Sequence, residues 1–178
     1  MLGELAWDHA VQDIPEEGLA VERSASPEEC EAVARSLDLL RCHSLMARYT
    51  IGPRSGGHVH LWGTVEAVVE QSCVVTLEPL LSRVAESFRV DFWPEGDMPE
   101  PAGGEIDISD QLDLEPIVAG RVEVGDVVFQ AVANGIDLFP RKPGVTFEPP
   151  TPPGSDDGSH PTGSTGPFAA LAKMKNRR

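Results

Sequence analysis

The chain has 178 residues, of which 40% are hydrophobic, and this is enough for the core of a single domain. It contains 29 acidic and 14 basic residues, which gives a net charge of −15 at pH 7. Because a strongly acidic surface repels phosphate, this balance argues against bare nucleic acid as the main ligand and favours a basic protein as a partner. The competing interpretation is that the acidic charge only keeps the protein soluble.

Signals for targeting and membrane insertion are missing from the sequence. The first residues have neither a basic region nor a sustained apolar run, so a signal peptide is not expected. No stretch approaches the roughly 18 apolar residues that a membrane span needs. We therefore expect a cytoplasmic protein.

The charge is distributed unevenly along the chain. The part up to Val145 has a net charge of −16, whereas the rest has +1, and all basic residues of the rest follow Leu171. We predict a single domain over residues 1–144, a disordered linker rich in proline and glycine over residues 145–166, and a short apolar–basic tail motif over residues 167–178.

The N-terminal part predicts two initial strands followed by a helix. The strands are expected within Leu5–Val11 and Gly18–Ser24. Ser26, with Glu29 three positions later, has the pattern of a capping box, in which two side chains satisfy each other's free backbone N–H groups. Apolar residues at helical spacing then predict an amphipathic helix that ends near residue 39.

The most regular segment of the chain is Val59–Leu77, which follows a predicted strand at Leu45–Ile51. In this segment every second residue is mostly apolar and the intervening set is mostly polar, which is typical of a half-buried antiparallel sheet. Because a single strand of that length is unusual, we expect a bend or hairpin near Glu70–Ser72. A further strand reaches Phe92, with a helical turn at Pro79 as one option for its start.

The remaining elements are a loop and a second helix. Asp97–Asp113 is acidic and rich in proline and glycine, which predicts an exposed loop. Apolar spacing predicts an amphipathic helix from Val124 to Val132, stopped by Asn134-Gly135. The expected fold class is therefore α+β, with a strongly bent antiparallel sheet, barrel-like in one version, packed against two amphipathic helices and followed by a disordered C-terminal tail.

His58 and His60 are candidate metal ligands, because two imidazoles on one strand face can hold zinc. Further ligands would have to come from Cys42, His43, Glu66 or Glu70. The favoured interpretation is a solvated strand face without a metal, because nothing in the sequence forces these groups together. We expect no cofactor and no metal.

The three cysteines, Cys30, Cys42 and Cys73, are odd in number and widely spaced, so they do not suggest a disulfide framework. Cys30 and Cys73 fall on the apolar faces of their elements. Buried cysteine behaves as a small hydrophobe, whereas a nucleophilic thiol needs an accessible, electropositive site. We therefore expect core roles and, since no other catalytic pattern appears, a protein that is not an enzyme.

Two further features are candidates for partner contacts. Trp62 lies on the polar side of its strand and would either anchor a contact or be covered by the first helix or the acidic loop; we favour the second. Arg141 and Lys142 form a small basic cluster that would contact RNA or carboxylates.

The last residues combine apolar and basic side chains. Phe168, Leu171 and Lys175 fall at helical spacing after a proline-rich run. The basic residues of this tail are Lys173, Lys175, Arg177 and Arg178. A short apolar–basic segment on a flexible tether is how disordered regions bind partners. The alternative is a tail that packs back on its own domain.

The run from Gln71 to Pro79, QSCVVTLEP, resembles the hallmark motif of the YceD family, bacterial proteins named for large ribosomal RNA subunit accumulation. The similarity extends over most of the chain, through FRVDFWP, the acidic segment, residues 115–144 and the ending GPFAALAKMK. The residues of this chain that carry the motif are Gln71, Cys73, Thr76, Leu77, Glu78 and Pro79. Many members have further cysteines near the end, but this chain has none after Leu138, which speaks against a cysteine-based metal site.

The resemblance implies a role in producing or assembling the large ribosomal subunit. From the residues we expect a non-catalytic mechanism, in which the acidic domain binds a basic ribosomal protein or assembly factor and the tail adds a second, weaker contact. One alternative is direct binding of precursor ribosomal RNA through Arg141, Lys142 and the tail cations. A lower alternative is a metal-dependent hydrolase that uses His58 and His60. No contact with DNA or a membrane is expected.

Overall fold

The computed structural model describes residues 4–98 and 113–147. Most of the predicted acidic loop and the whole predicted tail motif therefore lie outside the described residues. The α-helices and strands of the described residues are β1 (Asp8–Ala10), β2 (Leu19–Ser24), α1 (Pro27–Ser36), β3 (Arg41–Pro53), β4 (Val59–Ser72), β5 (Pro79–Pro94), β6 (Asp113–Ile117), β7 (Arg121–Glu123) and α2 (Val124–Gly135). By its internal contacts the chain divides into one unit of residues 1–145 and a second unit of residues 146–178.

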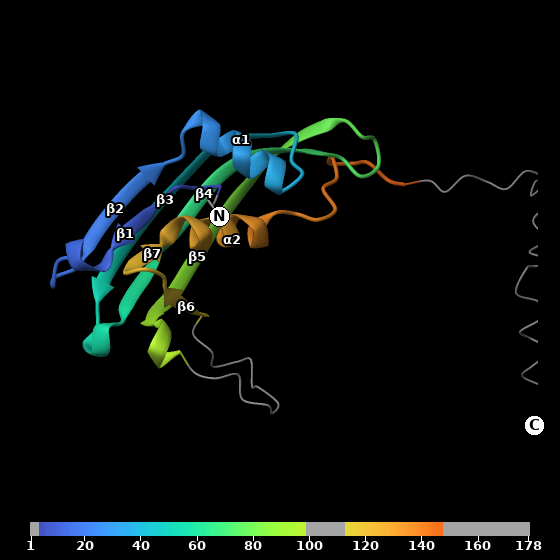
Figure 1. The fold of residues 1–178 in the computed structure, drawn as a ribbon. Helices are drawn as coiled ribbons and strands as arrows, with labels where there is room; N and C mark the ends of the chain where they lie inside the picture. Colours follow the sequence, from blue (N-terminus) through green and yellow to red (C-terminus); the bar gives the residue numbers. More distant parts are fainter. Residues whose placement is uncertain (1–3, 99–112, 148–178) are drawn as a thin grey trace, which may run out of the picture. The chain divides into compact units, whose positions relative to one another are not determined.

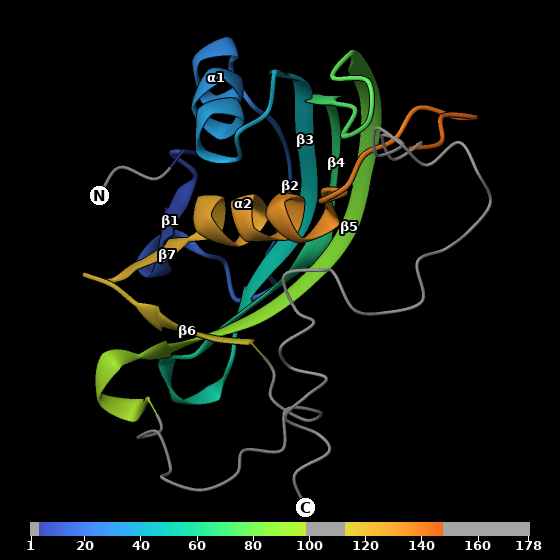
Figure 2. The ribbon, with the colours of Figure 1, turned by 90° about the vertical axis from the view of Figure 1, so that its right-hand side faces the viewer.

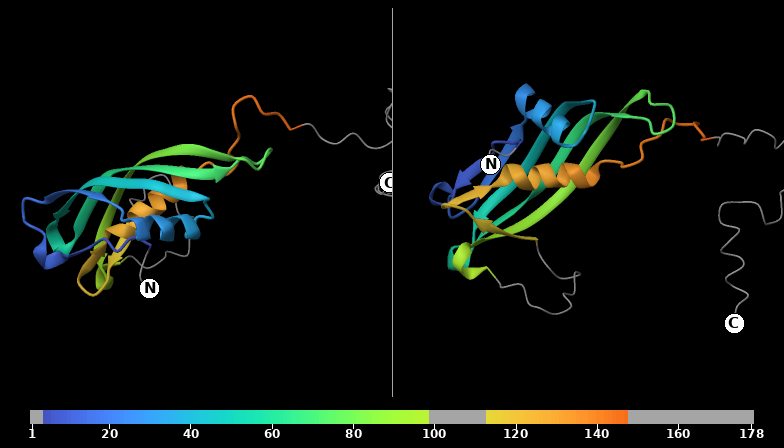
Figure 3. Two further views of the ribbon diagram at one scale, coloured as in Figure 1. Left: turned by 90° about the horizontal axis from the view of Figure 1, so that it is seen from above. Right: turned by 45° about the vertical axis from the view of Figure 1, so that its right-hand side comes forward.

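The first unit is built on a five-stranded sheet with the order β2-β3-β4-β5-β6. Neighbouring strands in this sheet are antiparallel, except for β5 and β6, which are parallel. Strands β1 and β7 form a separate two-stranded antiparallel sheet. The large sheet is strongly bent, and both helices lie on one of its faces (Figures 1, 2 and 3). This arrangement confirms the predicted α+β class, and the sheet is open rather than closed into a barrel.

The core lies between the helices and the inner face of the sheet. Apolar residues at alternate positions of β3, β4 and β5 face it, and the largest fully buried side chains are Trp7, Phe92, Leu45, Ile51 and Leu61. Alternation along the strands therefore separates the two faces of the sheet as the sequence predicts. The outer face carries mostly polar side chains and no helix among the described residues.

Helix α1 starts at the predicted capping box. The Ser26 hydroxyl accepts a hydrogen bond from the Glu29 backbone N–H at 3.2 Å, and the Glu29 carboxylate accepts one from the Ser26 N–H at 2.8 Å. The other oxygen of the same carboxylate accepts the indole N–H of the fully buried Trp7 at 2.8 Å. One side chain thus caps the helix and satisfies a buried donor. The helix ends at Ser36, three residues before the predicted end.

The double role of Glu29 leads to a stability prediction. We expect Glu29→Ala to lower the free energy of unfolding by about 2–3 kcal/mol, because it removes a helix cap and leaves the buried indole N–H of Trp7 without a partner. Urea unfolding followed by circular dichroism measures this change. Glu31→Ala, at an exposed position of the same helix, is the matched control and should stay within about 0.5 kcal/mol of the wild type. Equal effects of the two substitutions would contradict this role of Glu29.

The long alternating segment forms a hairpin, but its turn lies later than predicted. Strand β4 continues to Ser72, which pairs with Pro79, and the turn occupies Cys73–Glu78. The predicted position near Glu70–Ser72 is therefore wrong by a few residues. Strand β5 begins directly at Pro79, so a helical turn at that point is also wrong. Alternation of apolar residues continues into the turn, and for this reason it does not mark where the strand ends.

Candidate interaction surface at the hairpin end

The turn between β4 and β5 contains most of the QSCVVTLEP motif. Cys73 N–H donates to the Glu78 carbonyl at 2.9 Å, and Leu77 N–H donates to the Cys73 carbonyl at 2.8 Å. Leu77 has φ = 59°, a left-handed conformation that is uncommon for residues other than glycine. Two internal hydrogen bonds thus close the turn. They hold Leu77 in a backbone conformation that costs free energy.

The segment that follows α2 runs along this turn. The Gln71 side chain donates to the Asp137 carbonyl at 2.8 Å, and Val74 N–H donates to the Pro140 carbonyl at 2.9 Å. Lys142 Nζ lies 2.7 Å from the Glu78 carboxylate. Figure 1 shows the chain after α2, in orange, passing the green hairpin turn. Residues from Asp137 to Lys142 are therefore attached to the hairpin at three points.

Large apolar side chains are exposed where these two segments meet. Leu77 and Leu138 are each 78% exposed and Phe139 is 69% exposed, while Val74 is 43% exposed. Phe139 is also held by its backbone, because its N–H donates to the Asp137 side chain at 2.9 Å. We call these four residues, Val74, Leu77, Leu138 and Phe139, the hairpin platform. A group of exposed apolar side chains on a fixed backbone is typical of a protein-binding surface.

Cys73 is buried at the base of this turn, but its surroundings are polar. Its side chain is 0% exposed, yet it lies outside the apolar core cluster. The pKa of the Cys73 thiol is lowered to about 6, mainly because the Thr76 hydroxyl donates to it and further because the backbone N–H groups of Lys142 and Thr76 do so. These donors outweigh the effect of burial, which raises the pKa. Cys73 is thus buried, as predicted, but it lies in the turn rather than in the apolar core cluster, and its lowered pKa favours the thiolate at neutral pH.

This lowered pKa predicts a pH dependence of stability. An unfolded cysteine titrates near 9, so the contribution of Cys73 is complete above pH 9, is lost as the pH falls and is absent below about pH 6. The free-energy difference between the wild type and Cys73→Ala should therefore grow from pH 6 to pH 8.5. Urea unfolding of both proteins at the two pH values measures it. A difference that does not change with pH would contradict the thiolate assignment.

The motif residues thus divide into two groups by what they contact. Gln71, Cys73, Thr76 and Glu78 make polar contacts that hold the turn and the segment from Asp137 onward. Leu77 points its side chain away from the protein, although the alternation had placed it on the apolar face. The sequence pattern indicates the motif but not the exposed residues Leu138 and Phe139. Their signal is an apolar pair between an aspartate and a proline, where no helix or strand is expected.

The basic cluster is only partly available for binding. Lys142 is paired with Glu78, and this contact lowers the pKa of the Glu78 carboxyl. Arg141 is exposed, and within residues 4–98 and 113–147 no carboxylate lies within 4.0 Å of it. The predicted tail contacts Phe168, Leu171, Lys173, Lys175, Arg177 and Arg178 lie outside the described residues.

The two histidines considered for a metal site have other neighbours. His60 Nδ1 is paired with Asp91, and the His60 ring lies 5.1 Å from the Trp62 ring. His58 stacks on Trp93, with ring centroids 4.3 Å apart. In the part of the chain that the structure describes, no group of three or more histidine, cysteine, aspartate or glutamate side chains is arranged to hold a metal ion.

Trp62 lies on the outer face of the sheet and is 42% exposed. The favoured expectation, that the first helix or the acidic loop covers it, is wrong for the helix, because α1 packs on the other side of the sheet (Figure 2). Shallow hollows of about 320 and 410 Å³ adjoin the indole. The smaller hollow is lined by Glu16 and Glu17 but also by Arg54, so the charge of its lining is mixed.

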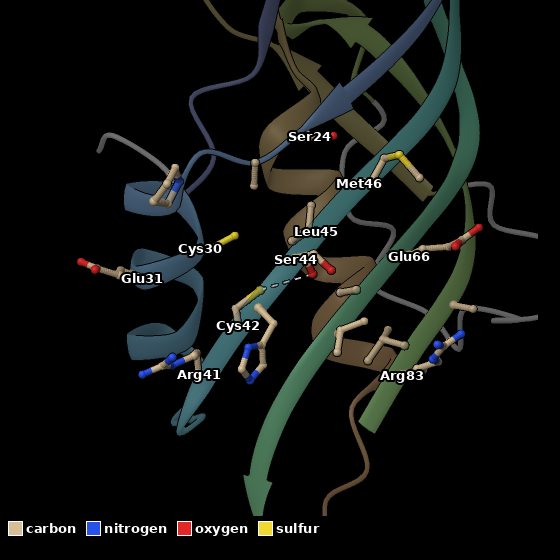
Figure 4. Close-up of a pocket in the computed structure, with 17 residues that line it drawn as sticks. Ser24, Cys30, Glu31, Arg41, Cys42, Ser44, Leu45, Met46, Glu66 and Arg83 are labelled. Atoms are coloured by element: carbon tan, nitrogen blue, oxygen red, sulfur yellow. Dashed lines mark hydrogen bonds between the residues drawn. The ribbon is translucent and has the colours of Figure 1, made fainter. Parts of the chain in front are cut away.

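A hollow of about 870 Å³ lies beside α1 and over β3, β4 and β5. Figure 4 shows Cys30 of α1 and Cys42 of β3 at this site. The pKa of the Cys42 thiol is raised to about 12, first by burial and then by the neighbouring Cys30. Both cysteines are buried, as predicted for Cys30, and Cys42 stays protonated at neutral pH and is a poor nucleophile.

No family model, curated protein or solved structure matches this chain. Among the described residues, no helix is both long and apolar enough to cross a membrane. The role of the hairpin platform as a binding surface is therefore inferred from its own geometry.

Proposed function

We propose that this protein is a non-catalytic, cytoplasmic factor in the biogenesis of the large ribosomal subunit, and that it binds a basic ribosomal protein or assembly factor through the hairpin platform. The observation that carries the proposal is the display of four apolar side chains on a backbone that polar contacts hold in place. Such preorganisation lowers the entropic cost of association and suits a binding surface. The ribosomal setting rests on the resemblance of the QSCVVTLEP motif, which builds this turn.

The charge of the protein supports a basic partner. Residues 1–145 have a net charge of −16, and a field of that sign attracts a cationic protein over several ångströms and speeds its association. In this proposal the hairpin platform provides most of the binding free energy, and the acidic surface attracts the basic partner and speeds its association. The C-terminal residues 167–178 add a weaker second contact, which becomes effective because it is tethered to the first.

Direct binding of ribosomal RNA is the alternative, and one observation makes it weaker. Of the two cations at the hairpin end, Lys142 is neutralised by Glu78, and Arg141 is the one without a carboxylate within 4.0 Å among the described residues. A single exposed arginine in an acidic domain provides little attraction for phosphate. The hydrolase alternative is weaker still, because His60 is already paired with Asp91 and His58 stacks on Trp93.

A pull-down of the full-length chain from lysate of its own source tests the proposal, with one half of the lysate treated with nuclease. We expect large-subunit ribosomal proteins or assembly factors, identified by mass spectrometry, to remain bound after nuclease treatment. Loss of these proteins together with the RNA would favour direct RNA recognition. Absence of ribosomal material from both halves would overturn the proposed function.

A further inference from the structure

Among the residues that the structure describes, one edge of β5 has no strand partner over most of its length. Strand β5 pairs with β4 from Pro79 to Phe92, but with β6 only from Val90 to Pro94. In the described part of the chain, no strand pairs with the other edge of β5 between Pro79 and Arg89. The backbone N–H and C=O groups along such an edge form a template on which another chain can add as a strand.

A groove runs beside this free edge. It has a volume of about 460 Å³ and lies between β5, the start of β6 and the side of α2. Its lining includes Glu86, Phe88, Asp113, Val127, Gln130 and Asn134. Figure 2 shows α2 crossing the sheet next to β5 and β6. An added strand would therefore lie against the helix on one side and have room for its side chains there.

The α2 side of this edge is negatively charged. Glu86 lies against the end of α2, since a Cβ atom at Gly135 would come within 2.7 Å of the Glu86 side chain. Glu115 has a raised pKa, first because it is partly buried and then because Asp126 and Asp113 lie near it. Within residues 4–98 and 113–147, none of these four carboxylates has a basic side chain within 4.0 Å.

The other side of the same edge carries positive charge. Arg83 and Arg89 alternate with Val84 and Phe88 along β5, so they project from the outer face, where Arg89 pairs with Trp62 across the strands. The two faces of the edge thus differ in sign. Side chains of an added strand also alternate between the two faces of the sheet. Those that point toward α2 would face the carboxylates on that side, and those that point the other way would face Arg83 and Arg89.

We propose that the free edge of β5 binds an extended, basic segment of a partner protein by strand addition, with basic residues at every second position directed toward Glu86, Asp113 and Glu115. This inference adds to the proposed function a second contact site for the same partner. It rests on the proposed function in one respect, the basic character of the partner. The backbone hydrogen bonds of the edge provide affinity that does not depend on the sequence of the partner segment. The carboxylates select segments with a basic side chain at every second position.

The probe for this site is a synthetic peptide of alternating valine and lysine, eight residues long and blocked at both ends, added to the purified full-length chain. We expect it to slow amide hydrogen exchange within Pro79–Arg89, and we expect Glu86→Lys to weaken its binding by at least about tenfold. Glu31→Lys makes the same charge change on the exposed side of α1 and should leave binding unchanged.

Two results would overturn the inference. One is a peptide that binds without slowing exchange in Pro79–Arg89, or that does not bind. The other is equal binding by Glu86→Lys and Glu31→Lys. Should Glu86→Lys fail to fold, Glu86→Gln combined with Asp113→Asn makes the same net change of charge, +2, and is read in the same way. Because this experiment contains no ribosomal material, its failure is distinct from a failure of the pull-down.

Discussion

Gly125→Ala is expected to lower the free energy of unfolding by about 3 kcal/mol, the largest stability loss from a single methyl group that we predict in this protein. Gly125 is the second residue of α2, where the helix rests on the chain just before β1. A Cβ atom at this position would lie 2.0 Å from the Leu5 carbonyl oxygen and 2.9 Å from the Leu5 carbonyl carbon. These are backbone atoms, so relief requires that the whole segment move.

That movement would also affect neighbouring contacts. Gly125 N–H donates to the Trp7 carbonyl at 2.8 Å, and Trp7 and Val124 are both fully buried. Displacing the helix start therefore disturbs the core where β1, β7 and α2 meet.

Urea unfolding of Gly125→Ala and Gly96→Ala tests this prediction. At Gly96 a Cβ atom would have no neighbour within 4 Å, and the backbone does not have a positive φ, so the same substitution should change the free energy by no more than about 0.5 kcal/mol. A Gly125→Ala protein as stable as the wild type would show that α2 does not approach Leu5 as closely as described.

The double substitution Leu77→Asp and Phe139→Asp is expected to weaken partner binding by about 100-fold or more while the fold is retained. Both side chains are largely exposed, so introducing carboxylates costs little in the free protein. In a complex, apolar anchors at the centre of an interface commonly contribute about 2 kcal/mol or more each, and a buried carboxylate adds a desolvation penalty. The measurement is the amount of partner recovered at equal concentrations of bait.

Val118→Asp is the matched control for this prediction, because Val118 is also an exposed apolar residue, at 47%, but lies between β6 and β7 rather than at the hairpin end. It should bind as the wild type does. Undiminished binding by the double variant, with circular dichroism showing that it is folded, would remove the hairpin platform from the proposed function.

Elements with strong local signals could be predicted from the sequence. Helix α1 begins where Ser26 and Glu29 place it, because a capping box involves residues only three apart. Strands β3 and β4 follow from alternation, since one face of each is buried. Strand β6 was missed because it is short, contains Pro116 and carries acidic residues, and because its pairing with β5 is parallel and involves distant residues.

The candidate site was predicted only in part. The motif was identified from Gln71 to Pro79, but alternation cannot tell a buried apolar residue from an exposed one, and Leu77 was therefore placed on the wrong side. Alternation predicts the burial of Cys73 but not its lowered pKa, because its hydrogen-bond donors include Lys142, which is distant in the sequence. The exposure of Phe139 depends on how the segment after α2 attaches to the hairpin, which no local pattern records.

The most direct test of the central claim is co-sedimentation with large-subunit particles on sucrose gradients, with the wild-type chain compared with the Leu77→Asp/Phe139→Asp variant. We expect the wild type to sediment with large-subunit or precursor particles and the variant, although folded, to stay at the top of the gradient. Equal sedimentation of both proteins with the particles, or of neither, would contradict it.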